Sequence, residues 1–309
     1  MSNTVETTDR GTADPRVAAP SPLRKPIIII GSPRSGTTFI SSLLKHHSQL
    51  AFFDEPRLVW RYGNDRKSDM LSADDARPDV IRHIRHRFSG MMTATGKARM
   101  LEKTPANSVR VEFVDRVFPD ARFVHVIRNG IDAVLSIRQF WIEHARGPHQ
   151  GIARGRIWQR LREVQLRRLP FYAKEVVRRF APAALVPLVG QNVWGVRVPG
   201  IEQMLAEMDL LDVCCMQWRM CVETACQQGR KLPANRYLEY RQEDLTPELV
   251  KRVLAFCELD EEPAVWDAFH RAFDPSRATG RKDRAENQDV RRIRGLVAPT
   301  MSWLGDSGA

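Results

Sequence analysis

The sequence predicts a three-layer α/β fold with a central parallel sheet of about five strands flanked by helices. Short apolar runs alternate with segments of helix length, and that spacing requires crossover connections between parallel strands. The first run, residues 27–30, consists of four consecutive isoleucines, the pattern of a strand buried on both faces. Ligands of such sheets bind outside the carboxyl ends of the strands, so the residues that follow each strand are the first candidates for a site.

The expected elements follow in chain order. The isoleucine run leads through a turn into a helix over residues 36–47. Four further runs have strand character: 50–53, 99–102, 122–127 and 236–240. The run at 99–102 is the weakest of these. Helix-length segments separate the runs, which again favours a parallel arrangement.

The chain is expected to form one domain over residues 26–305. Residues 1–25 are rich in Ser, Thr, Pro and Ala and are expected to be a disordered leader, and 306–309 a tail. Residues 140–200 carry tryptophans and many arginines and are expected to be a helical insertion that binds the acceptor. An apolar run beside basic residues at 175–195 is compatible with contact to a membrane interface, while the alternative is a lid packed on the core.

Composition restricts the classes of partner and location. The formal net charge is +11, which favours polyanionic partners, but the arginines are scattered without interleaved aromatic residues, so no nucleic acid is expected. No apolar run reaches the about 18 residues of a membrane span, which predicts a cytoplasmic protein. The five cysteines are odd in number and lack zinc-ligand spacing, so neither a metal nor a disulfide framework is expected.

The turn after the isoleucine strand has the glycine spacing of a phosphate-binding loop, which makes the predicted fold one of P-loop type. Gly31 and Gly36 stand where a nucleoside triphosphate loop has its glycines, but Thr37 occupies the position of the usual lysine. The positive charge lies inside the loop instead, at Arg34. This relocation favours an anionic donor other than a magnesium nucleoside triphosphate, the alternative being a tight turn with incidental polar residues.

The loop offers several kinds of donor to such an anion. Four residues are expected to direct backbone N–H groups at it: Ser35, Gly36, Thr37 and Thr38. The helix that begins there adds roughly half a positive charge, and the hydroxyls of Thr37 and Thr38 are further donors. Arg34 adds a permanent charge on a planar fork suited to phosphate or sulfate oxygens.

A second anion clamp is expected after the strand at 122–127. Arg128 follows this strand directly, and Ser136 lies eight residues further on, about two turns into the next helix. Asn129 with Asp132 has the pattern of a helix cap. An arginine and a hydroxyl in this arrangement suit a second phosphate group.

Two glutamates also follow strands, and either is a candidate base. Glu55 comes just after the strand at 50–53, and Glu102 closes the strand at 99–102. In isolation each would be interpreted as a solvated carboxylate or an ion-pair partner, but at the sheet edge either is placed to accept a proton from an attacking hydroxyl. Lys103 and Arg34 are then placed to neutralise charge on a transferred group.

These motifs together resemble the sulfotransferases that use 3′-phosphoadenosine 5′-phosphosulfate (PAPS). The segment 31–39 resembles their 5′-phosphosulfate loop, and 123–136 resembles the strand and helix that bind the 3′-phosphate, with Arg128 and Ser136 at the family's spacing.

The resemblance extends to the residues after the second and third strands. Residues 54–56 look like the segment that carries the base glutamate in heparan sulfate 3-O-sulfotransferases and tyrosylprotein sulfotransferases. Residues 102–105 are similar to a Glu-Lys-Thr segment whose lysine approaches the sulfuryl group. Two later segments, 237–245 and 298–305, also resemble the bacterial and tyrosylprotein branches, so the resemblance covers most of residues 26–305.

There are departures from the family pattern. The cytosolic small-molecule branch has lysine where this chain has Arg34, and its histidine base has no counterpart that we can place. The late phosphate-binding loop is matched only loosely by residues 279–282, which assigns Arg281 and Lys282 as less certain helpers at the 3′-phosphate. Residues 140–200 match nothing that identifies a substrate.

The resemblance implies a sulfotransferase that moves a sulfuryl group from PAPS to an acceptor hydroxyl by in-line displacement, leaves 3′-phosphoadenosine 5′-phosphate (PAP) and needs no metal. Its implied catalytic residues are Glu55, Arg34 and Lys103. The acceptor is left open among a glycan, a glycolipid, a phenolic metabolite and a protein tyrosine, as is the oligomeric state. The alternatives are a P-loop kinase of a small molecule and a non-catalytic module that binds nucleotides or anionic membranes.

Overall fold

The computed structural model describes residues 23–145, 193–274 and 287–305. Its strands are β1 (Ile27–Ile30), β2 (Leu50–Asp54), β3 (Arg99–Lys103), β4 (Arg122–Ile127) and β5 (Tyr237–Arg241). The helices before β5 are α1 (Thr37–Leu44), α2 (Arg57–Trp60), α3 (Pro78–Thr93), α4 (Val111–Val117), α5 (Gly130–Ala145), α9 (Ile201–Glu207) and α10 (Leu210–Gly229). After β5 come α11 (Pro247–Phe256), α12 (Pro263–Ala272) and α14 (Gln288–Trp303). Short 3₁₀ turns are η1 (Ala73–Asp75), η2 (Pro105–Val109) and η5 (Gln242–Asp244).

The five strands form one sheet in the order β2-β3-β1-β4-β5, and every neighbouring pair is parallel. The predicted parallel α/β sheet is therefore confirmed. The strands lie at the predicted places, two of them with the predicted bounds and the others within one residue at either end. The central position of β1 explains its isoleucines, since all four are fully buried and alternate between the two faces of the sheet.

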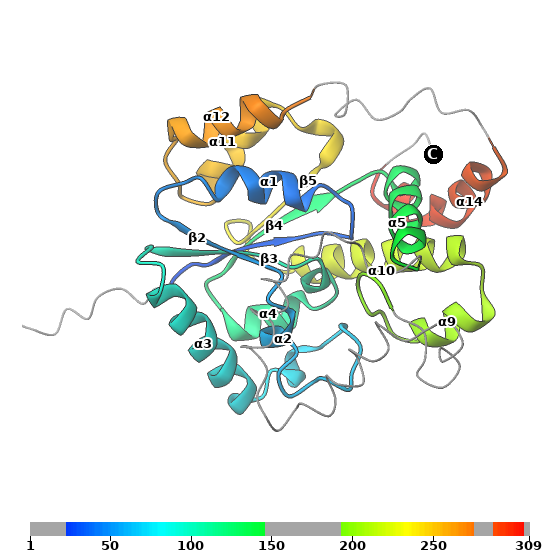
Figure 1. Cartoon of the computed structure of the whole chain (residues 1–309), viewed down its shortest axis with the longest axis horizontal. Helices are drawn as coiled ribbons and strands as arrows, with labels where there is room; N and C mark the ends of the chain where they lie inside the picture. The colour runs from blue at the N-terminus through cyan, green and yellow to red at the C-terminus, as the bar shows by residue number, and fades with distance from the viewer. Residues whose placement is uncertain (1–22, 146–192, 275–286, 306–309) are drawn as a thin grey trace, which may run out of the picture.

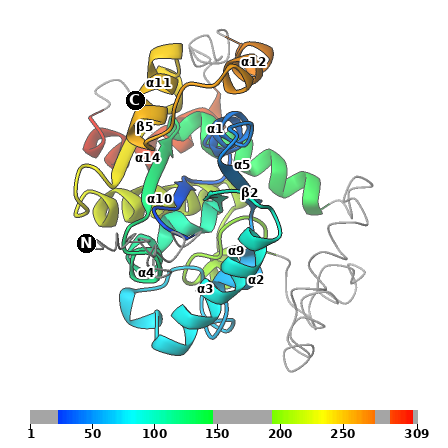
Figure 2. The same ribbon diagram turned by 90° about the vertical axis from the view of Figure 1, so that its left-hand side faces the viewer.

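Helices cover both faces of the sheet (Figure 1). On one face, α1, α11 and α12 pack on alternate strand residues such as Ile27 and Ile29. On the other, Ile28 and Ile30 lie in a cluster with side chains of α3 and α4. Figure 2 shows the same division from the side, with α11 and α12 at one end and α2 and α3 at the other. This is the three-layer arrangement that the sequence predicts.

A third cluster lies beside the carboxyl half of the sheet and joins α5, α9, α10 and α14 (Figure 1). It buries Trp218 completely and Trp141 almost completely, and the Trp141 indole Nε1 donates to Gln217 Oε1 at 3.4 Å. Residues 140–145, which the sequence assigns to the insertion, continue α5, and Trp141 is a core residue.

Gly31 is required by a close approach of two strands. A Cβ atom at this position would lie 2.5 Å from the carbonyl oxygen of Val126 in β4 and 2.5 Å from Ser35 Oγ. The backbone oxygen of a central strand cannot move aside without disturbing the sheet. The loop therefore begins with glycine because of packing, not because of an unusual backbone angle.

We expect Gly31→Ala to lower the free energy of unfolding by about 1–3 kcal/mol or more, the range found for overpacked cores. Urea denaturation followed by circular dichroism measures this change. Gly295→Ala is the matched control, because a Cβ there meets nothing within 4 Å and alanine favours the interior of α14. Equal stability of the two variants would contradict the packing argument.

Candidate active site

The loop between β1 and α1 has a strained backbone. Arg34 has a φ of 67° and Gly36 a φ of 98°, both in the left-handed region that residues with a side chain rarely adopt. The Ser35 N–H donates to Ser32 O at 3.2 Å and so closes the turn. Strain at an arginine persists only where the surroundings impose it, and such positions are concentrated at functional sites.

The loop has polar groups that fit an anion. The hydroxyls of Ser32 and Ser35 are buried and have no hydrogen-bond partner among the described residues. The Ser35 amide is used within the turn, whereas the amides of Gly36, Thr37 and Thr38 have no main-chain acceptor among the described residues. Buried hydroxyls without partners are costly unless a ligand or water satisfies them. We conclude that the loop suits a bound phosphate or sulfate group.

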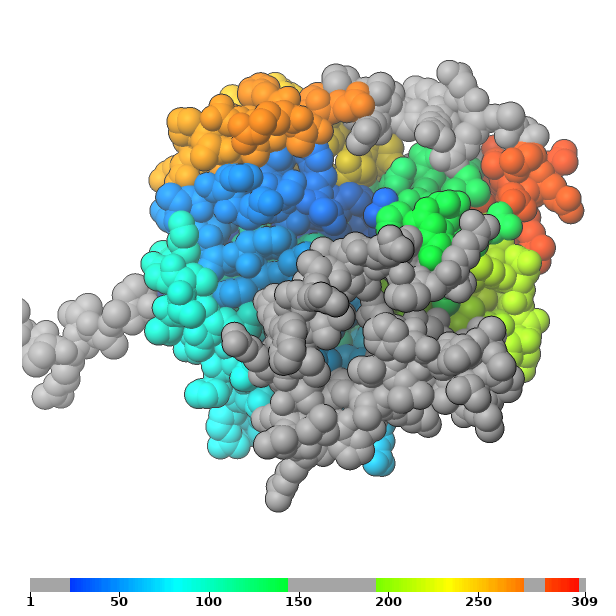
Figure 3. Space-filling model, in the orientation of Figure 1, coloured from blue at the N-terminus to red at the C-terminus, as the bar shows by residue number. Residues whose placement is uncertain are grey.

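The structure brings the loop together with the second predicted clamp. Arg34 Nε donates to Ser136 Oγ at 3.0 Å, across 102 positions of sequence. The Arg34 guanidinium also stacks on the ring of Phe140, with its Cζ 3.9 Å from the ring centroid. Figure 3 shows the blue residues of the β1–α1 region beside the green residues of α5. Phe140 is not among the predicted site residues, because only the fold places it one turn after Ser136 on α5.

Arg128 joins the same cluster from the end of β4. Its Nη1 donates to the carbonyl oxygen of Arg34 at 3.0 Å. Partial burial and the charge of Arg128 both lower the pKa of Arg34, with Glu143 acting in the opposite direction. Two adjacent guanidinium groups repel each other in the absence of a ligand, so an anion bound between them relieves the repulsion.

The turn from β4 into α5 is capped as predicted. Asn129 Oδ1 accepts from the N–H groups of Ile131, at 3.0 Å, and Asp132, at 3.4 Å. The cap fixes the start of α5 and therefore the position of Ser136 relative to the end of β4.

Glu55 lies at the end of β2 and pairs with two cations. Arg57 donates to its Oε2 at 2.6 Å through Nη2, and Lys103 Nζ donates to its Oε1 at 3.1 Å. Although burial alone would raise the pKa of Glu55, the charges of Arg57 and Lys103 lower it to about 2. Its φ of 53° is a second strained backbone position at this edge of the sheet. Arg57 is not a predicted site residue, although its position two residues after Glu55 is visible in the sequence.

Lys103 connects the second and third strands. Its side chain is almost completely buried, and its Nζ lies 2.7 Å from Asp54 Oδ1 as well as 3.1 Å from Glu55. The Glu55 N–H also donates to Lys103 O at 2.9 Å. The predicted pair of Glu55 and Lys103 is thus in direct contact, with the lysine bonded to carboxylates in this structure.

Glu102, the other candidate base, is fully buried on the opposite face of β3 from Lys103. Its Oε1 accepts from Trp60 Nε1 at 3.0 Å and from Thr104 Oγ1, and its Oε2 accepts from Asn107 Nδ2 at 3.0 Å. Burial raises its pKa to about 7, against the opposing effect of these donors and of Arg110. Both oxygens of Glu102 are therefore occupied and enclosed, whereas the Glu55 side chain is partly exposed at the edge of the sheet.

The raised pKa makes Glu102 a pH-dependent contributor to stability. Between the ordinary value of 4.5 and about 7 the folded protein binds more protons than the unfolded chain, so the contribution is present at low pH and is lost as the pH rises. His125 acts in the opposite direction, because burial lowers its pKa to about 4.

We expect the difference in the free energy of unfolding between wild type and Glu102→Gln to fall by up to about 1.4 kcal/mol per pH unit between pH 4.5 and about 7. Urea denaturation at several pH values measures it, and a constant difference would show that Glu102 is ionised throughout.

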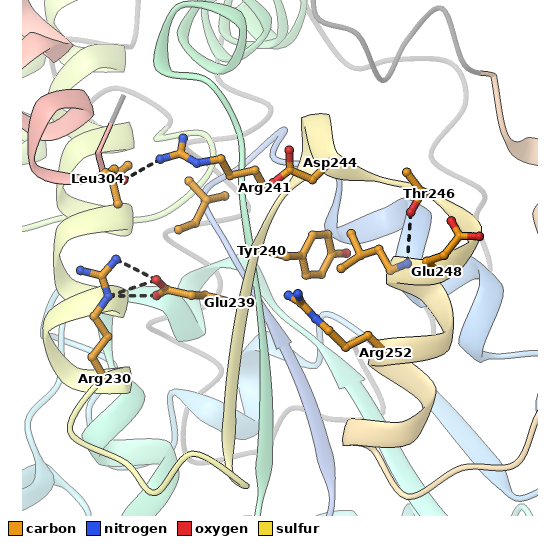
Figure 4. A pocket seen from close by; sticks show the side chains of 11 residues that line it. Arg230, Glu239, Tyr240, Arg241, Asp244, Thr246, Glu248, Arg252 and Leu304 are labelled. Carbon is orange, nitrogen blue, oxygen red and sulfur yellow. Dashed lines mark hydrogen bonds and ion pairs between the residues drawn. The ribbon is translucent and has the colours of Figure 1, made fainter. Parts of the chain in front are cut away.

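A pocket of about 450 Å³ lies along the outer edge of β5, and none of the predicted site residues lines it. Figure 4 shows two of its arginines engaged within the protein. Arg230 donates to both oxygens of Glu239, and Arg241 Nη2 donates to Leu304 O at 2.8 Å. We do not assign this pocket to the transfer reaction.

Three potential metal ligands lie together within the described part of the chain: His125, Cys226 and Glu239, with ligand atoms within 4.8 Å of one another. His125 Nδ1 is 2.6 Å from the hydroxyl of Tyr237, and Glu239 is paired with Arg230. Burial raises the pKa of the Cys226 thiol to about 12, which disfavours the thiolate that a metal needs. These contacts describe a buried hydrogen-bonded cluster.

Some of the residues that the sequence singles out lie outside the described part of the chain. They include Arg281 and Lys282, residues 1–22 of the leader, 146–192 of the proposed insertion and most of the 175–195 run. Among the helices that the structure describes, none combines the length and apolar character of a membrane span.

The strand ends thus present cations and buried hydroxyls to an anion beside a carboxylate paired with a lysine. A site of this kind is suited to bind an anionic group and to stabilise charge that develops on it. Residues 26–175, just under half of the chain, match the model of the sulfotransferase family, which supports the resemblance seen in the sequence.

The chain is also similar to individual proteins. It is 26% identical over 137 residues to the nodulation protein NoeE of Sinorhizobium fredii, covering 39% of this chain and 33% of that protein. It is 23% identical over 200 residues to an uncharacterized protein of Aquifex aeolicus, covering 54% of this chain and 26% of that protein. The chain therefore spans a third or less of the length of these curated relatives.

Solved structures with a similar arrangement include the sulfotransferase domain of the curacin biosynthetic pathway, with a TM-score of 0.48 and 15% identity. The match covers 89% of this chain and 98% of that domain. A sulfotransferase from Alicyclobacillus acidocaldarius has a TM-score of 0.48 and 11% identity, with 92% of this chain and 97% of that chain covered.

Proposed function

We propose that the protein transfers the sulfuryl group of PAPS to a hydroxyl group of an acceptor. The acceptor oxygen attacks sulfur, the bond from sulfur to the bridging phosphate oxygen breaks, and PAP leaves with the electron pair of that bond. The hydroxyl proton passes to Glu55. The reaction is a direct in-line displacement, in which the protein contributes positioning and charge.

The observation that carries this proposal is the meeting of the two predicted clamps. Arg34 bonds Ser136, and Arg128 bonds the backbone of Arg34, so one cluster of donors spans the loop and the start of α5. A donor with anionic groups at two ends fits such a cluster. A kinase loop would place a lysine where Thr37 stands.

On the donor side, the loop from Arg34 to Thr38 holds the 5′-phosphosulfate, through the Arg34 guanidinium, the Ser35 hydroxyl and the amides of residues 36–38. Arg128 and Ser136 hold the 3′-phosphate, with Arg281 and Lys282 as further candidates. Arg34 is the residue proposed to stabilise the charge that develops on the leaving oxygen, because its guanidinium is oriented by Phe140 and Ser136 where the loop meets α5.

The lowered pKa of Glu55 is compatible with its role as base. An acceptor hydroxyl is far less acidic than a carboxylic acid. The proton on its oxygen becomes strongly acidic, however, as the bond from that oxygen to sulfur forms. A carboxylate with a pKa of about 2 then accepts the proton late in the displacement. As this happens Lys103 loses an anionic partner, and its ammonium is available to the sulfuryl oxygens.

The acceptor is proposed only as a class. A glycan, a lipid-linked glycan, a phenolic metabolite and a tyrosine all present a hydroxyl that suits a carboxylate base.

Parallel incubations test the proposal. The purified protein is given ³⁵S-labelled PAPS in one reaction and labelled ATP with magnesium in another, each with an extract of candidate acceptors. We expect PAP release and a product heavier by one sulfuryl group in the first reaction only. Transfer from ATP would support the kinase alternative, and binding of either nucleotide without turnover would support a non-catalytic module.

A further inference from the structure

The segment that follows β5 contacts both predicted anion clamps. Gln242 and Glu243 form the first two positions of η5, directly after the edge strand of the sheet. The sequence gives this segment a family resemblance but no role. Because η5 follows the carboxyl end of β5, it lies at the same edge of the parallel sheet as the β1–α1 loop and Arg128.

Gln242 packs against the loop. A Cβ atom added at Gly36 would lie 2.0 Å from Gln242 Oε1, so the side-chain amide covers the glycine directly. Gln242 Oε1 is buried and has no hydrogen-bond partner among the described residues. The side chain therefore covers the turn from the loop into α1.

Glu243 holds the start of the second clamp. Its Oε1 accepts from the backbone N–H of Asn129 at 2.8 Å, across 114 positions of sequence. Asn129 is the residue after Arg128, so this bond fixes the peptide that carries the arginine. The charged groups that face Glu243 are Arg128 and, at the first turn of α5, Asp132.

We infer that Glu243 is a positioning residue for the donor site. It holds Arg128 at the distance from the loop that a donor with anionic groups at two ends requires. The inference rests on the proposed function. Gln242 and Glu243 are adjacent, so one short segment touches the Gly36 turn with one side chain and the Arg128 turn with the other. The sheet pairs β1 with β4 and β4 with β5, and this segment adds a side-chain link between all three strand ends.

The charge of Glu243 and its hydrogen bond have opposite effects on a bound phosphate. The carboxylate reduces the attraction of Arg128 for the phosphate, whereas the bond to Asn129 keeps the arginine in place. Glu243→Gln removes the charge and keeps an oxygen acceptor, and Glu243→Ala removes both. A comparison of these two variants isolates the positioning effect.

The test is calorimetric titration of PAP into wild type and both variants, with thermal unfolding measured in parallel. We expect Glu243→Gln to bind PAP at least as tightly as wild type and Glu243→Ala to bind about tenfold more weakly than Glu243→Gln, as the loss of one hydrogen bond to a partly buried amide predicts. With PAPS as donor, Glu243→Ala should raise KM more than it lowers kcat.

Asp244 provides the matched control. It is the next residue, exposed and in the same turn, so Asp244→Asn and Asp244→Ala should bind PAP alike. Equal PAP affinities of Glu243→Gln and Glu243→Ala, in a wild type that binds PAP, would overturn the inference and leave the proposed function standing. Lower thermal stability of Glu243→Ala with unchanged affinity of the folded protein would also overturn it. A wild type that does not bind PAP would overturn the proposed function and the inference together.

Discussion

Replacing Glu55 with glutamine is expected to lower turnover by about 100-fold or more, with PAP affinity retained. Glutamine keeps the shape of the side chain and an oxygen that accepts from Lys103 or Arg57, but it cannot take a proton from the acceptor hydroxyl. The residues proposed to bind PAPS lie on the β1–α1 loop, at the end of β4 and on α5, so the change at Glu55 does not alter them. Steady-state rates with PAPS and calorimetry with PAP measure the two effects separately.

Asp54→Asn is the control for this change. Asp54 contacts the same Lys103 Nζ, at 2.7 Å, and is half exposed. A general electrostatic effect on Lys103 would slow both variants alike, whereas a base at Glu55 predicts a large loss only in Glu55→Gln. Wild-type turnover in Glu55→Gln would remove Glu55 from the mechanism, and Glu102 would not replace it easily because it is enclosed by Trp60 and Asn107.

The sheet is predictable because its signals are local. The run of four isoleucines and the segment 122–127, which is rich in β-branched and aromatic residues, each indicate a buried strand whatever their neighbours are. The glycine spacing of the loop is equally local. For these reasons the amino-acid sequence alone predicts the strand positions and the parallel arrangement correctly.

The contacts between side chains that follow different strands are less predictable from the sequence. Glu55 and Glu102 look alike in the sequence, each at a strand end, and only the alternation of faces along β3 shows that Glu102 turns into the core. The contact of Gln242 with Gly36 depends on the order of strands in the sheet. From the sequence, Phe140 is assigned to the start of the insertion. Nothing in the sequence shows that α5 continues to residue 145, or that the Phe140 ring stacks on the Arg34 guanidinium.

Removing the side chain of Arg128 is expected to have the second large effect, on donor affinity. Arg128→Ala should weaken PAP binding by about 100-fold, since hydrogen bonds to a charged phosphate contribute about 1.5–3 kcal/mol. The change acts twice, because Arg128 is proposed to bind the 3′-phosphate and also donates to the carbonyl oxygen of Arg34, whose backbone is strained. Loss of that bond lets the loop relax away from the geometry that binds an anion.

Two further variants make the measurement specific. Arg128→Lys keeps the charge and loses the planar fork, so its affinity should lie between wild type and Arg128→Ala. Arg138→Ala removes another arginine from the same region of α5, one that pairs with Asp289 at 2.7 Å, and should leave PAP affinity unchanged. Calorimetry that found equal PAP affinity in wild type and Arg128→Ala would show that the 3′-phosphate is held elsewhere. The meeting of Arg34, Arg128 and Ser136 would then be a structural contact of the loop, and the donor assignment would have to rest on the loop alone.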